Sequence, residues 1–249
     1  MAQHFITRAV LQAARSLPRY PNLDVIDLAC GRGEIAASLA KDGCPVRGSR
    51  FRADDYELAS AKPVFDGSFV VDEGVDLEAK LPYESSSFDV VILAEVIEHL
   101  ESHRPIVAEI GRILRPGGHL ILSTPNIARL HSRLHFLLSG THKLIRRRVG
   151  WDIPPDEFYA YHANPVDFPV LHTLLYHAGL RVTDLRFTRF KWGHAWTALA
   201  WPFVALAVTR ETSHRLESPL HAAGERDLRR WMLHPAMLFS EQLLLVARK

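Results

Sequence analysis

The chain has 249 residues, of which 47% are hydrophobic and 23% are charged, and its formal net charge at pH 7 is +2. This length and composition suit a single domain with one substantial core. The small net charge does not by itself indicate a nucleic acid partner, and we expect none. Two cysteines, Cys30 and Cys44, are too few for a disulfide framework. We therefore expect a reducing compartment and a cytoplasmic location.

The first 20 residues lack acidic side chains and repeat apolar residues at helical spacing. A mitochondrial presequence has a similar composition. The segment lacks the apolar core of a signal peptide, however, and runs within a few residues into the first predicted strand. These features favour an amphipathic helix that packs on the domain.

Apolar runs alternate with helical runs along the rest of the chain. Helices are predicted at 34–43 and 105–114, and the second is stopped by Pro116-Gly117-Gly118. Strands are predicted at 23–30, 44–50, 68–71, 88–95, 119–125, 181–187 and 241–249. Continuous apolar strands separated by helices indicate an α/β domain whose mostly parallel, seven-stranded sheet is covered by helices on both faces.

Two segments depart from this pattern. Residues 126–150 contain six Lys and Arg residues and no acidic residue, which is typical of a solvated face or of a contact with an anionic substrate or membrane. Residues 195–208 are nearly all apolar, yet too few to cross a bilayer, which takes about 20 residues. With Trp192 just before it, this run suits a bilayer interface, a helix over a substrate pocket or a dimer contact. One hypothesis is therefore peripheral membrane contact through 126–150 and 192–208.

The stretch VIDLACGRGEIAASLA, residues 25–40, predicts a strand that turns into a helix at a glycine-rich loop. Such a turn presents free backbone N–H groups to a polar or anionic cofactor, and its glycines allow close approach. The pattern Gly31-x-Gly33-x-x-Ala36 fits a dinucleotide fingerprint, in which Arg50 would meet a 2′-phosphate. An NADP-dependent oxidoreductase is therefore one alternative.

The longer stretch DLACGRG resembles motif I of the class I S-adenosylmethionine-dependent methyltransferases. The resemblance implies a Rossmann-like methyltransferase fold with strand order 3-2-1-4-5-7-6 and S-adenosylmethionine as cofactor. It also implies that Asp27, Ala29, Gly31 and Gly33 belong to the cofactor site, with the acid fixing the loop. Ala29 stands where the family often has its first glycine.

The resemblance continues through VDLEAKLPYESSSFDVVILAEVIEHL and RILRPGGHLILSTPN, so that it covers residues 24–126. It implies that Asp76 and Leu77 border the adenine and that Asp76 accepts a hydrogen bond from the exocyclic amine. The family's second strand usually ends in an acid that binds the ribose hydroxyls, but here the matching residue is Arg50, which cannot accept a hydrogen bond. Asp54 or Asp55 could replace that acid; otherwise cofactor affinity is reduced, or the fold is kept as a binding or regulatory module without activity.

The residues EVIEHL follow the fourth predicted strand, where a parallel sheet has its ligand crevice. If they begin a helix, Glu95, Glu98 and His99 share one face. We predict His99 and Glu98 as catalytic, with His99 as general base toward a hydroxyl, and Glu95 as a residue of the cofactor pocket. A metal held by all three is an alternative by similarity to small-RNA 2′-O-methyltransferases and ubiquinone-pathway O-methyltransferases, and structural hydrogen bonding is another; we assign no metal.

The segment YHANPVDFPVLHTLLYHAGLRVTDL resembles bacterial methyltransferases of polysaccharide, lipid and cell-envelope biosynthesis. His162 and Asn164 in it would face the substrate, or Asn164 would serve a turn. We expect one methyltransferase domain over residues 1–249, with a core at 20–189 and 240–249 and a helical insert at 190–239. The expected reaction is methyl transfer, preferably to oxygen, on a small-molecule, glycan or lipid-linked acceptor.

Overall fold

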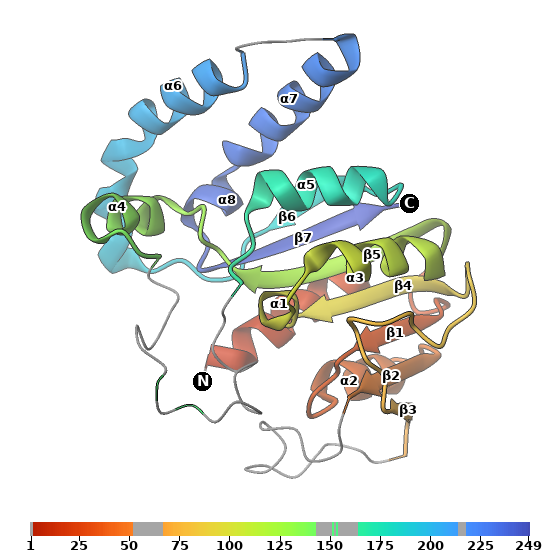
Figure 1. The fold of residues 1–249 in the computed structure, drawn as a ribbon. Coiled ribbons are helices and arrows are strands. Elements are labelled where there is room, and N and C mark those ends of the chain that lie inside the picture. The colour runs from red at the N-terminus through yellow and green to blue at the C-terminus, as the bar shows by residue number, and fades with distance from the viewer. Residues whose placement is uncertain (1, 52–66, 143–150, 152, 154–163, 214–217) are drawn as a thin grey trace.

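A computed structural model describes residues 2–51, 67–142, 151, 153, 164–213 and 218–249. Its centre is a seven-stranded sheet with the order β3-β2-β1-β4-β5-β7-β6 (Figure 1). The strands are β1 (Val25–Leu28), β2 (Val46–Arg50), β3 (Val70–Glu73), β4 (Phe88–Ala94), β5 (Leu114–Pro125), β6 (Arg181–Arg186) and β7 (Gln242–Arg248). Only β7 runs antiparallel to its neighbours. The predicted fold class and strand order are thereby confirmed.

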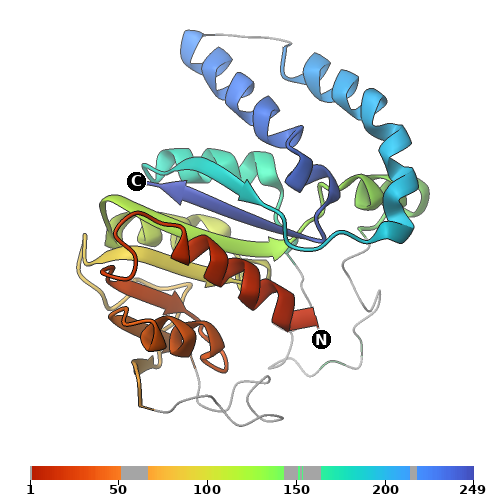
Figure 2. The same cartoon turned by 180° about the vertical axis from the view of Figure 1, so that it is seen from behind.

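Helices cover both faces of this sheet, as the continuous apolar strands predicted. The helices α1 (Ala2–Arg15) and α2 (Glu34–Lys41) pack on one face, and α3 (His103–Ile113) and α5 (Phe168–His177) pack on the other (Figure 2). The strand β5 shows why two layers form, because Leu120 and Leu122 point into the α3/α5 core while Ile121 points into the α1/α2 core.

The N-terminal segment is an amphipathic helix, as predicted. Ile6, Val10 and Ala13 of α1 are buried in the core that this helix shares with β1, β4 and β7. The helix thus closes the sheet over its central strands.

The Pro116-Gly117-Gly118 stretch differs from its prediction. Helix α3 already ends at Ile113, and β5 begins at Leu114, so the stretch lies inside the strand as an irregularity in its pairing with β4. Gly117 has φ +81°, which a residue with a side chain rarely adopts. The irregularity brings Arg115 to the carboxylates of Asp24 and Asp89, at 2.6 and 2.8 Å.

The remaining helices lie in two places beside the sheet. The short turn η1 (Ile97–His99) follows β4, and helix α4 (Leu130–Ser139) follows β5. Between β6 and β7 come η3 (Trp192–Ala200), α6 (Trp201–Glu211), α7 (Pro219–Met232) and α8 (Pro235–Phe239). Helices α6 and α7 project from one end of the sheet (Figure 1).

The contact between α3 and α5 depends on one glycine. A Cβ at Gly111 would lie 2.4 Å from the carbonyl oxygen of Ala178, whereas a Cβ at Gly224 of α7 would meet nothing within 4 Å. We expect Gly111→Ala to lower the free energy of unfolding by about 1–3 kcal/mol, because backbone must move to admit the methyl group. The matched control Gly224→Ala should raise it by about 0.5–1 kcal/mol. Urea denaturation measures both values, and equal effects would contradict the close packing.

Candidate cofactor site

The turn between β1 and α2 is built from residues in left-handed backbone conformation. Ala29, Gly31 and Gly33 have φ values of +51°, +52° and +76°. The amide of Gly33 donates to the carbonyl of Cys30 at 2.8 Å, and Gly33 caps α2. The chain therefore reverses within five residues at the carboxyl edge of the sheet, where a parallel sheet binds its ligands.

Strand β2 holds this turn in place. Ser49 is fully buried; its hydroxyl accepts the amide of Ala29 at 3.2 Å, and its carbonyl accepts the amide of Cys30 at 2.9 Å. The amides of Gly31 and Arg32 donate to no acceptor among the described residues. These two N–H groups, at the N-terminus of α2, are available to a polar or anionic ligand.

Asp27 lies beneath the turn and is 2% exposed. Burial raises the pKa of this carboxyl to about 7, although the backbone amide of Ala36 donates to it and lowers the pKa in part. Its Oδ2 is buried without a hydrogen-bond partner in the described structure. A buried acceptor atom without a partner fits a site in which a ligand supplies the hydrogen-bond donor.

Arg50 ends β2 and is paired with an acid of the next strand. Its Nε lies 2.7 Å from both carboxylate oxygens of Glu73, which is the partner of Arg50 in the parallel register of β2 and β3. Position 50 thus holds an arginine in place of the acid that the family resemblance leads one to expect, and this arginine pairs with a carboxylate one strand farther out. Asp54 and Asp55, the predicted substitutes, lie outside the described residues.

Asp76 and Leu77 follow β3 at the same edge. Asp76 is exposed, and its Oδ1 accepts the amide of Glu78 at 2.9 Å, which is a local turn interaction. Leu77 is buried in the α3/α5 core, so that only its backbone could border a ligand. The role of both residues at the adenine stays a prediction.

The EVIEHL stretch does not begin an α-helix, and the expected common face of Glu95, Glu98 and His99 is wrong. Glu95 has φ +57°, and only Ile97–His99 forms a short 3₁₀ turn. Glu95 Oε1 accepts the Ser123 hydroxyl at 2.9 Å, whereas Glu98 Oε2 accepts the Thr124 hydroxyl at 3.0 Å. Ser123 and Thr124 are successive strand residues with side chains on opposite faces, so the two carboxylates diverge.

Glu98 is 2% exposed, and its Oε1 has no hydrogen-bond partner in the described structure. Burial raises the pKa of this carboxyl, while the charge of the adjacent His99 and the Thr124 hydroxyl lower it in part. The catalytic role of Glu98 stays a prediction. Among the described residues, no three His, Cys, Asp or Glu side chains gather as metal ligands.

Several supporting residues were not predicted from the sequence. They are Ser49, Glu73, Ser123 and Thr124. The available signal was their position, because each lies at the carboxyl end of an apolar strand. Asn164 donates to the carbonyls of Leu100 and Glu101 at 3.1 and 3.2 Å, which joins two distant segments and is not a local turn interaction. His162 lies outside the described residues.

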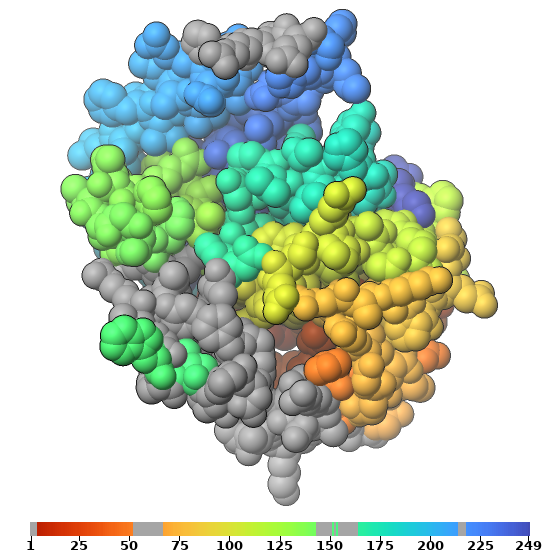
Figure 3. Space-filling view, in the orientation of Figure 1, coloured from red at the N-terminus to blue at the C-terminus, as the bar shows by residue number. Residues whose placement is uncertain are grey.

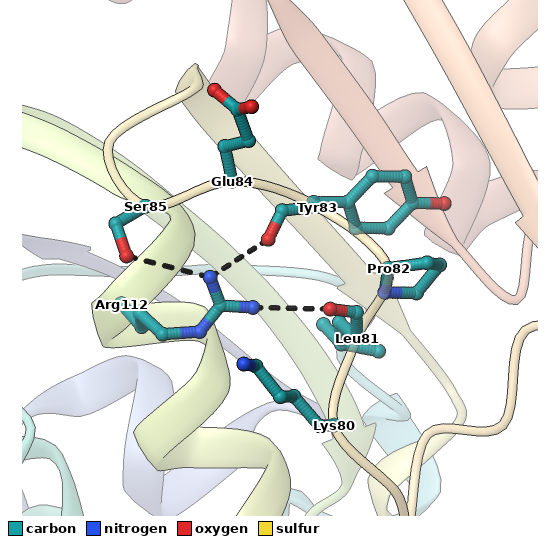
Figure 4. A pocket seen from close by; sticks show the side chains of 7 residues that line it. All are labelled: Lys80, Leu81, Pro82, Tyr83, Glu84, Ser85 and Arg112. Carbon is teal, nitrogen blue, oxygen red and sulfur yellow. Dashed lines mark hydrogen bonds between the residues drawn. The ribbon is translucent and has the colours of Figure 1, made fainter.

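A pocket of about 530 Å³ lies at the opposite edge of the sheet, between the 80–85 loop and Arg112 (Figure 4). The Arg112 guanidinium donates to the carbonyls of Leu81 and Tyr83 and pairs with Glu109. Its nitrogen atoms are thus used to hold the loop before β4. This pocket is remote from the turn at residues 29–33, and Arg112 in its lining stabilises the fold.

Comparison with known proteins gives matches to methyltransferases. Residues 26–122 match a family model described as a methyltransferase domain. A ubiquinone biosynthesis O-methyltransferase of Cupriavidus pinatubonensis is 34% identical over 102 residues, 41% of each chain, and that of Vibrio cholerae is 29% identical over 122 residues, 49% of each chain. The chain thus spans less than half the length of these curated relatives.

Solved structures share the fold over nearly the whole chain. S-adenosylmethionine-dependent methyltransferases of Mesorhizobium loti and Archaeoglobus fulgidus superpose with TM-scores of 0.53 and 0.54, at 17% and 16% identity, over 98% of this chain and 98% and 94% of theirs. The [4+2]-cyclase SpnF superposes with a TM-score of 0.53 at 18% identity, over 98% of this chain and 80% of its own. Residues 26–122 thus resemble a methyltransferase domain, and the chain shares its fold with solved S-adenosylmethionine-dependent methyltransferases.

Proposed function

We propose that this protein transfers a methyl group from S-adenosylmethionine to an oxygen of a small-molecule, glycan or lipid-linked acceptor of cell-envelope biosynthesis in the cytoplasm. The observation that carries the proposal is the left-handed turn at residues 29–33, with its two available N–H groups above the buried Asp27. The O-methyltransferase names of the relatives support oxygen as the accepting atom.

The residues at the carboxyl edge fit the cofactor. The turn amides and Asp27 would hold its methionine part, and Asp76 its adenine. Because Arg50 has no acceptor atom, Glu73 would accept the ribose hydroxyls, with Arg50 orienting the Glu73 carboxylate. When bound, S-adenosylmethionine supplies an electrophilic methyl group on a sulfonium.

His99 would take the proton of the acceptor hydroxyl as that oxygen becomes the nucleophile. Glu98, buried beside His99 and fixed by Thr124, would orient the imidazole and stabilise its charged form. Glu95, fixed by Ser123 on the other side, would face the cofactor.

The two alternatives differ in their support. The Arg50 guanidinium is engaged by Glu73, which weighs against a 2′-phosphate site and thus against an NADP-dependent oxidoreductase. Measuring S-adenosylmethionine binding tests the alternative that the chain keeps the fold but transfers no methyl group. Calorimetry that detects no S-adenosylmethionine binding at millimolar concentration would overturn the proposed enzyme.

The role of Glu73 predicts a selective loss of affinity. We expect Glu73→Gln to raise the Kd for S-adenosylmethionine at least tenfold, about 1.4 kcal/mol, because the amide is a weaker acceptor for the hydroxyls and a weaker partner for Arg50. Asp72→Asn is the matched control, since Asp72 is also a β3 acid paired with a β2 arginine, Arg47. Calorimetry should show a change below about twofold for this control. Equal losses in both variants would reduce Glu73 to a role in strand pairing.

The raised pKa of Asp27 predicts how stability depends on pH. Between about pH 4 and 7 the folded carboxyl binds a proton that the unfolded chain releases, so stability falls as pH rises through this range. Relative to Asp27→Asn, the ligand-free protein should lose up to about 1.4 kcal/mol per pH unit between pH 5 and 7. Urea denaturation at pH 5, 6, 7 and 8 measures the difference, and parallel profiles would contradict it.

His99 should matter for turnover and not for cofactor binding. We expect His99→Gln to lower kcat by about 10²-fold or more on the acceptor found by screening cell-envelope precursors with labelled methyl donor, because proton removal is lost. The Kd for S-adenosylmethionine should stay unchanged in calorimetry. His177→Gln on α5 is the control. Equal kcat in both variants would show that His99 takes no part in the reaction.

A further inference from the structure

Helix α6 is apolar but has no buried residue. Its sequence is WPFVALAVTRE, and none of these side chains is buried. Phe203 is 75% exposed and Leu206 is 58% exposed, and with Arg210 they share one helix face at positions i, i+3 and i+7. An apolar helix face exposed to water lacks the burial that normally stabilises such a helix. We therefore expect another surface to cover this face.

The exposed surface continues from α6 onto η3 and α4. Trp196 and Leu199 of η3 are 59% and 79% exposed, and they share one face because a 3₁₀ helix repeats every three residues. Leu137 and Leu138 at the end of α4 are also highly exposed. The two elements are in contact, since the rings of His131 and His194 stack with centroids 3.7 Å apart.

We name this surface the apolar edge and define it by six residues: Leu137, Leu138, Trp196, Leu199, Phe203 and Leu206. Helices α4 and α6 adjoin along one side of the molecule (Figure 3). The edge therefore extends over three elements rather than along one helix.

Positive charge accompanies the apolar edge. The segments 126–142 and 184–211 contain six Lys and Arg residues and two acids, namely Asp184, which pairs with Arg186, and Glu211. Arg210 ends the exposed face of α6, where its charged head can reach past the apolar side chains. The Arg-rich run at 143–150, which the sequence analysis also singled out, lies outside the described residues.

The base of the edge holds an excess of cations. Arg189 and Lys191 both pair with Glu241, and Arg129 also lies within electrostatic reach of this one acid. Arg129 is 7% exposed with an unpartnered Nε, and a buried Nη2 of Arg133 also lacks a partner in the described structure. Three cations around one carboxylate leave this region net positive.

We propose that the apolar edge docks on the surface of an anionic lipid bilayer. Indole rings, aliphatic side chains and an excess of cations over acids are the combination that such an interface favours. A second copy of the chain fits less well, because pairing the edge with itself would bring like charges together. None of the described helices is long and apolar enough to cross a bilayer, so the contact would be peripheral.

This proposal does not depend on methyl transfer, although it bears on the acceptor. Helix α4 begins five residues after β5 ends at Pro125, so the apolar edge adjoins the carboxyl edge of the sheet. Docking would bring the proposed site close to lipid-linked molecules.

Vesicle co-sedimentation of the full chain tests the proposal. We expect at least tenfold tighter binding to vesicles of equal parts phosphatidylglycerol and phosphatidylcholine than to phosphatidylcholine alone, a difference of about 1.4 kcal/mol. Added salt should weaken it. The double variant Phe203→Asp/Leu206→Asp should lose at least tenfold in partitioning, and Arg210→Gln should lose about fivefold, as expected for one interfacial cation.

Val170→Asp is the matched control, because Val170 is an exposed apolar residue of a helix, α5, away from the apolar edge. It should bind vesicles as the unchanged protein does. Circular dichroism should show the same folded state in all variants, since only exposed side chains change. Tryptophan emission should shift to shorter wavelength on adding anionic vesicles and should not shift in the double variant.

Two outcomes would overturn the proposal. One is equal pelleting with and without anionic vesicles. The other is a concentration-dependent dimer in sedimentation velocity that the double variant dissociates, with no vesicle binding, because the edge would then be an interface between copies of this chain.

Discussion

The turn between β1 and α2 depends on the buried end of β2. A left-handed backbone costs a residue with a side chain about 1–2 kcal/mol, and Ala29 adopts one. Ser49 compensates by accepting the amides of Ala29 and Cys30. The neighbouring Gly48 must lack a side chain, because a Cβ there would lie 2.8 Å from the Cys30 Sγ. The cofactor turn is thus held by the second strand as much as by its own glycines.

The same edge pairs an arginine of β2 with an acid of β3. Arg50 occupies the end of β2, and the parallel register sets Glu73 of β3 directly beside it. A guanidinium next to a carboxylate removes the unpaired positive charge and orients two acceptor oxygens. The end of β2 and the end of β3 thus carry one arginine–glutamate pair across two strands.

Side chains along β5 alternate between the two faces of the sheet, and this directs the residues that follow β4 to opposite faces. Ser123 and Thr124 are adjacent in sequence but lie on opposite faces, and each holds one glutamate. Glu95 is thereby drawn to the side of Asp27 and α2, and Glu98 to the side of α3. The left-handed conformation of Glu95 is what allows the chain to serve both sides within four residues. Strain of this kind is common where a chain is bent to build a site.

The sequence by itself determined the layered α/β fold, the strand order by resemblance, the amphipathic first helix and the turn that carries Asp27, because apolar period and glycine placement are local properties. Only the tertiary structure decided that Glu73 meets Arg50 and that Glu95 and Glu98 diverge, since strand register and left-handed residues depend on distant neighbours. The tertiary structure also determined that the apolar side chains of α6 stay exposed. An apolar run predicts that its side chains need a partner, but whether the protein core provides one is settled by packing, and here the core does not reach Phe203 and Leu206.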